Sequence, residues 1–128
     1  MHKIIVCGIT TAALFFSAAA VQAQGGQYAE GVSQLKSGDY QHALPALQSS
    51  AEQGDARSMF QLALMYHGGL EVEFNEAKAI ELYKAAADKG VVEAQQFLAA
   101  GYREGWWGLP MDYEQYRYWM DKSQQTHL

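Results

Sequence analysis

The chain has 128 residues, enough for one small domain, and its 14 acidic side chains outnumber its 9 lysines and arginines. A net charge of −5, with no basic stripe along the sequence, repels phosphate backbones and argues against a nucleic-acid partner. Because 49% of the residues are hydrophobic, the chain is also too apolar for an intrinsically disordered protein.

The first 23 residues, MHKIIVCGITTAALFFSAAAVQA, have the organisation of a secretory signal peptide. Lys3 is followed by an apolar run from Ile4 to Phe16 and then by small residues that end at Ala23. This run is shorter than the roughly 20 apolar residues that a membrane-spanning helix needs. We therefore expect cleavage after Ala23, a periplasmic or secreted chain of residues 24–128, and no stable membrane insertion after cleavage. An uncleaved membrane anchor is the alternative.

The single cysteine, Cys7, lies within the apolar run. Cleavage would therefore leave a chain with neither a disulfide nor a thiol nucleophile, which suits an oxidising compartment. It would also remove one lysine and no acid, leaving 8 basic and 14 acidic residues and a net charge of −6.

The remaining sequence predicts six helices in three antiparallel pairs and no strand. Asp39, Asn75 and Asp112 are side chains that suit helix N-caps, and the glycines at 68, 69, 101, 105 and 108 are expected to end helices. Pro45 should kink the second helix or delay its start. The helices are expected near residues 27–36, 39–53, 55–68, 75–89, 91–104 and 112–124.

One segment of the chain recurs 36 residues later. AEQGDARSMFQLALMYHGG (51–69) returns as ADKGVVEAQQFLAAGYREG (87–105), with six of nineteen positions identical. Among the repeated residues, Leu62, Ala63 and Tyr66 share one helical face. Trp107 lengthens the next period by one residue. A helical hairpin at such a period predicts an α-solenoid, in which stacking of the pairs supplies the core.

These repeats resemble the Sel-one-like (Sel1-like) repeat, a variant of the tetratricopeptide repeat with a longer loop between its helices. The first copy carries the resemblance at Leu62, Ala63, Tyr66, Gly69, Val72, Asn75, Ala79, Tyr83, Ala86 and Gly90. The second carries it at Ala94, Leu98, Ala99, Tyr102, Gly105, Gly108, Pro110, Asp112 and Trp119.

The resemblance implies an all-α fold, a short right-handed α-solenoid of three antiparallel helix pairs. Its domain would span residues 24–128, with a half-repeat at 26–54 and repeats at 55–90 and 91–126. The sequence departs from the family where Glu71 replaces a loop glycine, and where Tyr116 and Ser123 replace alanines. The bulky last helix would then close the stack.

The titratable residues do not form a catalytic pattern. His42, His67 and His127 lack a partner at metal-ligand spacing, and no motif for a nucleophile or a phosphate loop is present. We therefore expect no enzyme activity, no metal and no cofactor. Three carboxylates, Glu71, Glu73 and Glu76, are typical of a solvated loop and helix start, with a calcium site or a cationic partner as the alternative.

In stacks of this kind the first helix of each pair lines a concave face. The expected partner-binding residues on that face are Arg57, Phe60, Leu64, His67, Glu93, Gln96 and Arg103. Phe60 is the expected anchor because its counterpart in the next repeat is Gln96; alternatively, it packs against the first helix pair. Trp106 and Trp107 are candidate loop contacts, one packed under the loop and the other exposed.

The favoured interpretation is a monomeric, non-enzymatic protein–protein interaction module in the periplasm, which binds a protein or peptide on its concave helical face. One alternative is an immunity or inhibitor protein for a toxin that reaches the periplasm. Another is a hydrolase of cell-wall or β-lactam substrates, although no serine has a base in a recognisable context. Self-association through the Trp106–Trp107 loop or the last helix is a further option.

Overall fold

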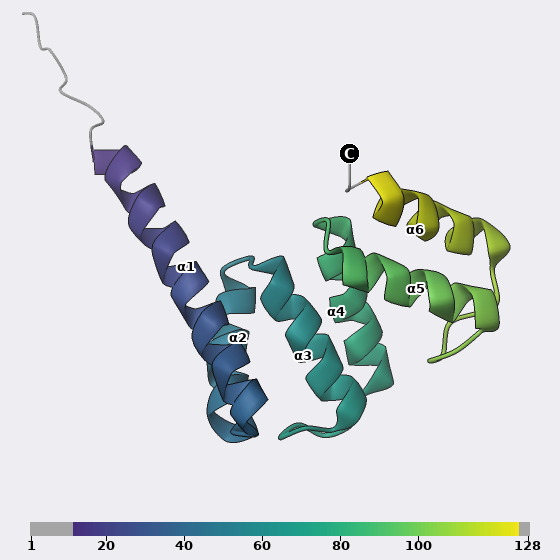
Figure 1. Cartoon of the computed structure of the whole chain (residues 1–128), viewed down its shortest axis with the longest axis horizontal. Helices are drawn as coiled ribbons and strands as arrows, with labels where there is room; N and C mark the ends of the chain where they lie inside the picture. Colours follow the sequence, from purple (N-terminus) through teal and green to yellow (C-terminus); the bar gives the residue numbers. More distant parts are fainter. Residues whose placement is uncertain (1–11, 126–128) are drawn as a thin grey trace, which may run out of the picture.

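The computed structural model describes the backbone of residues 12–125 and the side chains from residue 25 to residue 125, and this part of the chain contains helices and no strands. Short loops join the helices into three antiparallel pairs that stack side by side (Figure 1). The helices are α1 (Ala12–Ser37), α2 (Tyr40–Glu52), α3 (Ala56–Gly68), α4 (Glu76–Asp88), α5 (Val92–Glu104) and α6 (Tyr113–Gln125).

Helices α2 to α6 begin and end within one residue of their predicted positions, whereas the predicted start of α1 near residue 27 is wrong. This helix begins at Ala12, fifteen residues earlier. The alanine-rich sequence before Gly25 favours helix strongly enough to continue through two glycines. The expected delay of α2 by Pro45 is also wrong, since α2 begins at Tyr40. Pro45 and Gln41 are exposed, so water can satisfy the carbonyl group of Gln41, which would otherwise accept a hydrogen bond from residue 45.

All three expected N-caps are confirmed. Asn75 accepts a hydrogen bond from the amide of Lys78 at 3.0 Å, and Asp112 accepts one from the amide of Glu114 at 3.0 Å. At the start of α2, Asp39 accepts from the amide of His42 at 3.3 Å. Asp55 caps α3 in the same way.

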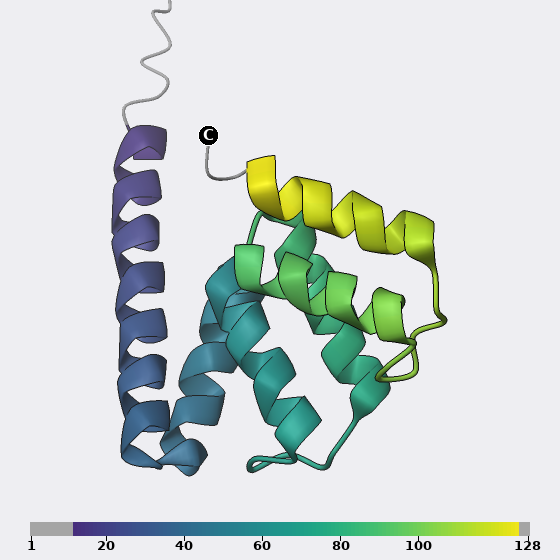
Figure 2. The ribbon, with the colours of Figure 1, turned by 45° about the vertical axis from the view of Figure 1, so that its right-hand side comes forward.

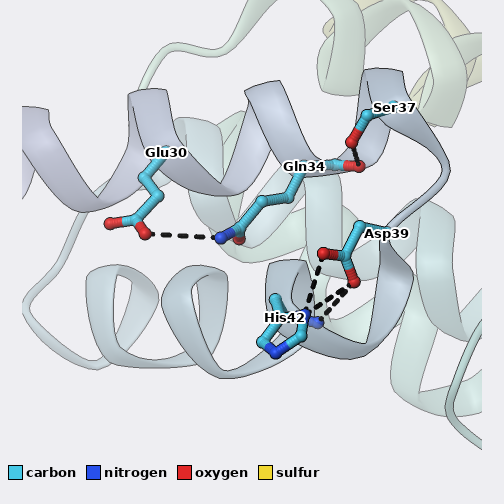
Figure 3. A network of polar contacts seen from close by, with 5 residues as sticks. All are labelled: Glu30, Gln34, Ser37, Asp39 and His42. Carbon is cyan, nitrogen blue, oxygen red and sulfur yellow. Dashed lines mark hydrogen bonds and ion pairs between the residues drawn. The ribbon is translucent and has the colours of Figure 1, made fainter.

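The turn between α1 and α2 is tied by a small polar network (Figure 3). Asp39 Oδ2 lies 2.8 Å from His42 Nδ1, and this side-chain hydrogen bond lowers the pKa of the aspartate. On α1, Gln34 donates to Glu30 at 3.3 Å, and its backbone carbonyl accepts the amide of Asp39 at 2.8 Å. The end of one helix and the start of the next are thereby held in a fixed turn.

Of the five glycines expected to end helices, Gly69 and Gly105 are C-caps and Gly68 is the last residue of α3, whereas Gly108 lies in the loop before α6 and Gly101 lies inside a helix. Gly69 and Gly105 follow α3 and α5 with φ values of 63° and 68°, a left-handed conformation that glycine adopts without strain. Gly101 lies inside α5, so its expected role as a helix stop is wrong. A Cβ atom there would lie 2.7 Å from Leu109 Cδ1, because the loop after α5 folds back onto the helix at this point.

The loops between paired helices also use left-handed residues other than glycine. Glu71 has φ 56°, a left-handed conformation that favours glycine. This conformation explains why the family that the sequence resembles prefers glycine at this position. The loop of the second repeat has two consecutive left-handed residues, Trp107 (φ 55°) and Gly108 (φ 70°), and is one residue longer.

Stacking of the pairs creates two apolar cores. In the first, Leu62 and Met65 of α3 pack against Ala43 and Leu47 of α2. The second extends through α4, α5 and α6 and has the fully buried Tyr83 near its centre. Because α3 contributes Leu62 to one core and Ala63 to the other, it joins the two halves of the solenoid.

Helix α1 is about twice as long as its partner and extends beyond it (Figure 2). Gln27 accepts a hydrogen bond at 3.1 Å from Gln53, the residue that caps the end of α2. Residues before Gln27 therefore lie past the end of the hairpin. In the described part of the chain, none of the helices combines the length and the apolar character needed to cross a bilayer.

A buried pair of serines joins α2 to α3. Ser58 donates a hydrogen bond of 2.7 Å to Ser50, and both residues are inaccessible to solvent. The equivalent positions between α4 and α5 hold Ala86 and Ala94, which are also fully buried. The same helix contact is thus built once with a hydroxyl pair and once with two methyl groups.

We predict that Ser58→Ala alone lowers the free energy of unfolding by about 1–3 kcal/mol, because it leaves the hydroxyl of Ser50 buried without its partner. The double variant Ser50→Ala/Ser58→Ala copies the alanine pair of the next interface and should cost less than about 1 kcal/mol. Urea unfolding of the wild type, Ser50→Ala, Ser58→Ala and the double variant measures the coupling between the two hydroxyl groups. Additive losses in the double variant would contradict this account.

Candidate functional site

A groove of 760 Å³ lies between the starts of α3 and α5, and we call it the α3–α5 groove. It brings together four of the residues that the sequence predicts on the concave face, namely Arg57, Phe60, Glu93 and Gln96. Its other lining residues include Tyr28 from α1, Gln61, Lys89 and Val92. The walls are thus mainly amide, charged and aromatic side chains from three successive helix pairs or their connections.

Arg57 is held in a fixed position at one side of this groove. Its Nη2 atom lies 2.9 Å from Asp55 Oδ2, and its guanidinium lies 4.1 Å above the ring of Tyr28. Burial of Asp55 opposes its charged form, but the hydrogen bonds and the positive charge of Arg57, together with the hydrogen bond from the amide of Ser58, keep the pKa of Asp55 below its usual value. The guanidinium is therefore preorganised between a carboxylate and an aromatic ring.

A row of stacked rings, which we call the aromatic wall, crosses from α4 through α5 to the following loop. The ring centroids of Tyr83 and Phe97 are 3.9 Å apart, as are those of Phe97 and Trp107. Phe60 lies against the same row, 5.8 Å from Tyr83, and also lines the groove. Its ring therefore contacts α4, rather than being confined to the first helix pair.

Phe97 is the central ring of the wall, and the sequence prediction missed it. Its counterpart in the preceding repeat is Gln61, just as the counterpart of Phe60 is Gln96. The comparison that selected Phe60 would also have selected Phe97. Phenylalanine and glutamine exchange places between the two helices, and both phenylalanines approach Tyr83.

His67 belongs to the aromatic wall and does not line the α3–α5 groove. Its ring stands edge-on to Phe97 and Trp107, with centroid distances of 5.6 and 5.7 Å. His67 Nδ1 lies 3.4 Å from the hydroxyl oxygen of Tyr83, and burial raises the pKa of Tyr83 to about 12. At neutral pH, Tyr83 is therefore an uncharged hydroxyl.

The remaining predicted residues lie outside the groove. Leu64 is 40% exposed on α3, and Arg103 is bound to Glu104 at 2.6 Å. The two tryptophans differ in their exposure, since Trp106 is 50% exposed whereas Trp107 packs on Phe97. Within residues 25–125, no three histidine or acidic side chains converge in a way that could hold a metal ion.

Comparison with solved structures identifies a neighbour for this arrangement. The crystal structure of a Sel1 repeat protein from Oxalobacter formigenes superposes with a TM-score of 0.60 at 26% sequence identity. The alignment covers 66% of this chain and 63% of that one, so the chain matches less than two thirds of that protein. No family model matches the sequence, and no curated protein matches it closely enough to count as a relative. The superposition and the stacked pairs together show that this protein has a Sel1-like repeat fold, an all-α solenoid.

Proposed function

We propose that the protein is a non-enzymatic interaction module that binds a protein or peptide in the α3–α5 groove. The observation that carries this proposal is Phe60, an aromatic side chain that lines an open groove at a position where the next repeat has Gln96. The solenoid therefore does not require a ring at this position. Aromatic side chains at the centre of a concave surface are frequent anchors of protein interfaces.

The chemistry of the groove suits a short stretch of extended chain. Phe60 offers an apolar surface to one side chain of a bound peptide. The amides of Gln61 and Gln96 can donate to and accept from a peptide backbone. The fixed guanidinium of Arg57 and the carboxylate of Glu93 supply opposite charges at the rim, which would set the direction of the bound chain.

This proposal predicts that Gln96→Trp, which fills the groove from an exposed position, abolishes partner binding without unfolding the protein. A photoactivatable amino acid at Lys89, an exposed residue that lines the groove and has no role in the proposed binding, should crosslink one partner from envelope extract. Gln96→Trp should reduce the crosslinking yield at least about tenfold, which corresponds to a loss of about 1.4 kcal/mol in the free energy of binding. Gln115→Trp, a change at another exposed glutamine, on α6, is the matched control. Undiminished crosslinking of the same partner in the Gln96→Trp protein would refute the groove as the binding site.

We also propose that the protein works in the periplasm after a signal peptide is cleaved behind Ala23. Gln27 already reaches the residue that caps α2, so the hairpin needs little of the chain before it. Cleavage would leave residues 24–37 in α1, 14 residues opposite the 13 of α2. The two helices of the first pair would then match in length, as they do in the other pairs.

Mass spectrometry of the exported protein should accordingly give Gln24 as the first residue. Ala23→Tyr places a bulky side chain at the cleavage position and should leave the chain unprocessed and in the membrane fraction. Ala18→Leu keeps the apolar run and should be processed normally. A water-soluble exported chain that still begins at Met1 would show that this proposal is wrong.

A further inference from the structure

Exposed apolar side chains gather at the loops that connect the paired helices of the two full repeats. Of the six large hydrophobic side chains that are exposed in the described residues, four lie in or next to these loops. They are Phe74 (58% exposed), Trp106 (50%), Met111 (75%) and Tyr113 (68%). We call these residues and the carboxylates around them the loop surface.

The two loops lie next to each other in space. The loop between α5 and α6 lies beside the start of α4 in both views (Figures 1 and 2). A Cβ atom on Gly108 would lie 3.0 Å from the carboxylate of Glu76. A chain of ring contacts also runs from Phe74 through His67 (6.5 Å) and Trp107 (5.7 Å) to Trp106 (5.4 Å). The exposed rings of the two loops are therefore parts of one region.

The charged side chains of the two loop segments have a single sign. Residues 70–76 and 104–114 contain no lysine or arginine and six acidic side chains: Glu71, Glu73, Glu76, Glu104, Asp112 and Glu114. Among the ion pairs of the described residues, only Glu104 of these six takes part, with Arg103. Lys78, two residues after Glu76, is paired with Glu81 and lines a different groove with residues of α2.

Two further cations lie near the loop surface: Arg117, exposed on α6 one turn after Glu114, and Lys84, farther along α4. Lys84 lines a groove of 500 Å³ between α4 and the second loop, two turns beyond Glu76. The carboxylates of the loop surface do not converge on a common point that could hold a metal ion, as far as the described residues extend. They surround an apolar region instead, which favours an extended cationic partner over a single bound ion.

We propose that the loop surface binds a cationic amphipathic peptide segment, in which lysines or arginines alternate with apolar or aromatic residues. The apolar side chains of such a segment would cover Phe74, Trp106 and Met111, and its cations would pair with the surrounding carboxylates. Arginine or lysine can also lie over the exposed ring of Trp106. A second copy of this chain fits poorly, because its own loop surface would place carboxylates against carboxylates.

This surface is separate from the α3–α5 groove, whose lining residues it does not share. The two proposals can therefore fail independently. The groove-filling variant Gln96→Trp should bind the cationic segment normally. Loss of that binding in Gln96→Trp, with the loop surface intact, would move the segment into the groove and overturn the loop-surface proposal alone.

The test is a fluorescence titration of the purified protein with a synthetic 12-residue peptide that alternates lysine with leucine and lacks tryptophan. The tryptophan emission should shift to the blue and saturate, because Trp106 is exposed whereas Trp107 packs on Phe97 and Trp119 is buried. A peptide with glutamate in place of lysine should not bind, and raising the salt from 50 to 300 mM should weaken the lysine peptide several-fold. Equal binding of both peptides would overturn the proposal.

Glu71→Gln/Glu73→Gln removes two exposed carboxylates from the loop surface and should weaken the lysine peptide by about three- to tenfold. Glu52→Gln/Asp121→Asn removes two exposed carboxylates from elsewhere and should change the affinity less than twofold. Phe74→Ser should abolish the blue shift while the helical circular dichroism is retained. Equal losses in the two charge variants, or self-association of the free protein that Phe74→Ser removes, would overturn the proposal.

Discussion

Every part of this fold depends on the fact that a single helix pair is too thin to bury its own apolar face. Helix α3 shows the consequence most clearly: Leu62 packs toward the preceding pair, and the adjacent Ala63 belongs to the core of the following pairs. Small side chains at Ala63 and Ala79 let the helices approach closely, and Tyr83 fills the space between the stacked pairs. The core is thus a property of the stack and not of any one repeat.

The same constraint separates residues that the fold needs from residues that are free to acquire a function. Several positions between stacked helices are occupied by the same residue type in successive repeats, as Leu62 and Leu98 illustrate. Phe60 and Phe97 stand where the other repeat has glutamine, and the solenoid forms in both cases. The groove and the loop surface are built from such unrepeated residues, and each draws on more than one helix pair.

Periodicity and capping chemistry were sufficient to predict the helices, because Asp39, Asn75 and Asp112 mark helix starts through contacts within a few residues. The start of α1 was not predictable in this way, since its alanine-rich sequence favours a helix and also has the pattern of a signal peptide. The role of Gly101 was not predictable either. Its missing side chain makes room for Leu109, and the loop sequence alone does not specify this contact. The aromatic wall joins α4, α5 and a loop, so it required the arrangement of the pairs in space.

The dependence of the fold on stacking can be tested most directly by circular dichroism of residues 55–90, the middle helix pair, in isolation. This account predicts little helix and no cooperative thermal transition, because the faces that carry Leu62 and Tyr83 would be exposed to water. The complete chain should melt cooperatively under the same conditions. A cooperative, strongly helical transition of the isolated pair would contradict the account, since each repeat would then be stable without its neighbours.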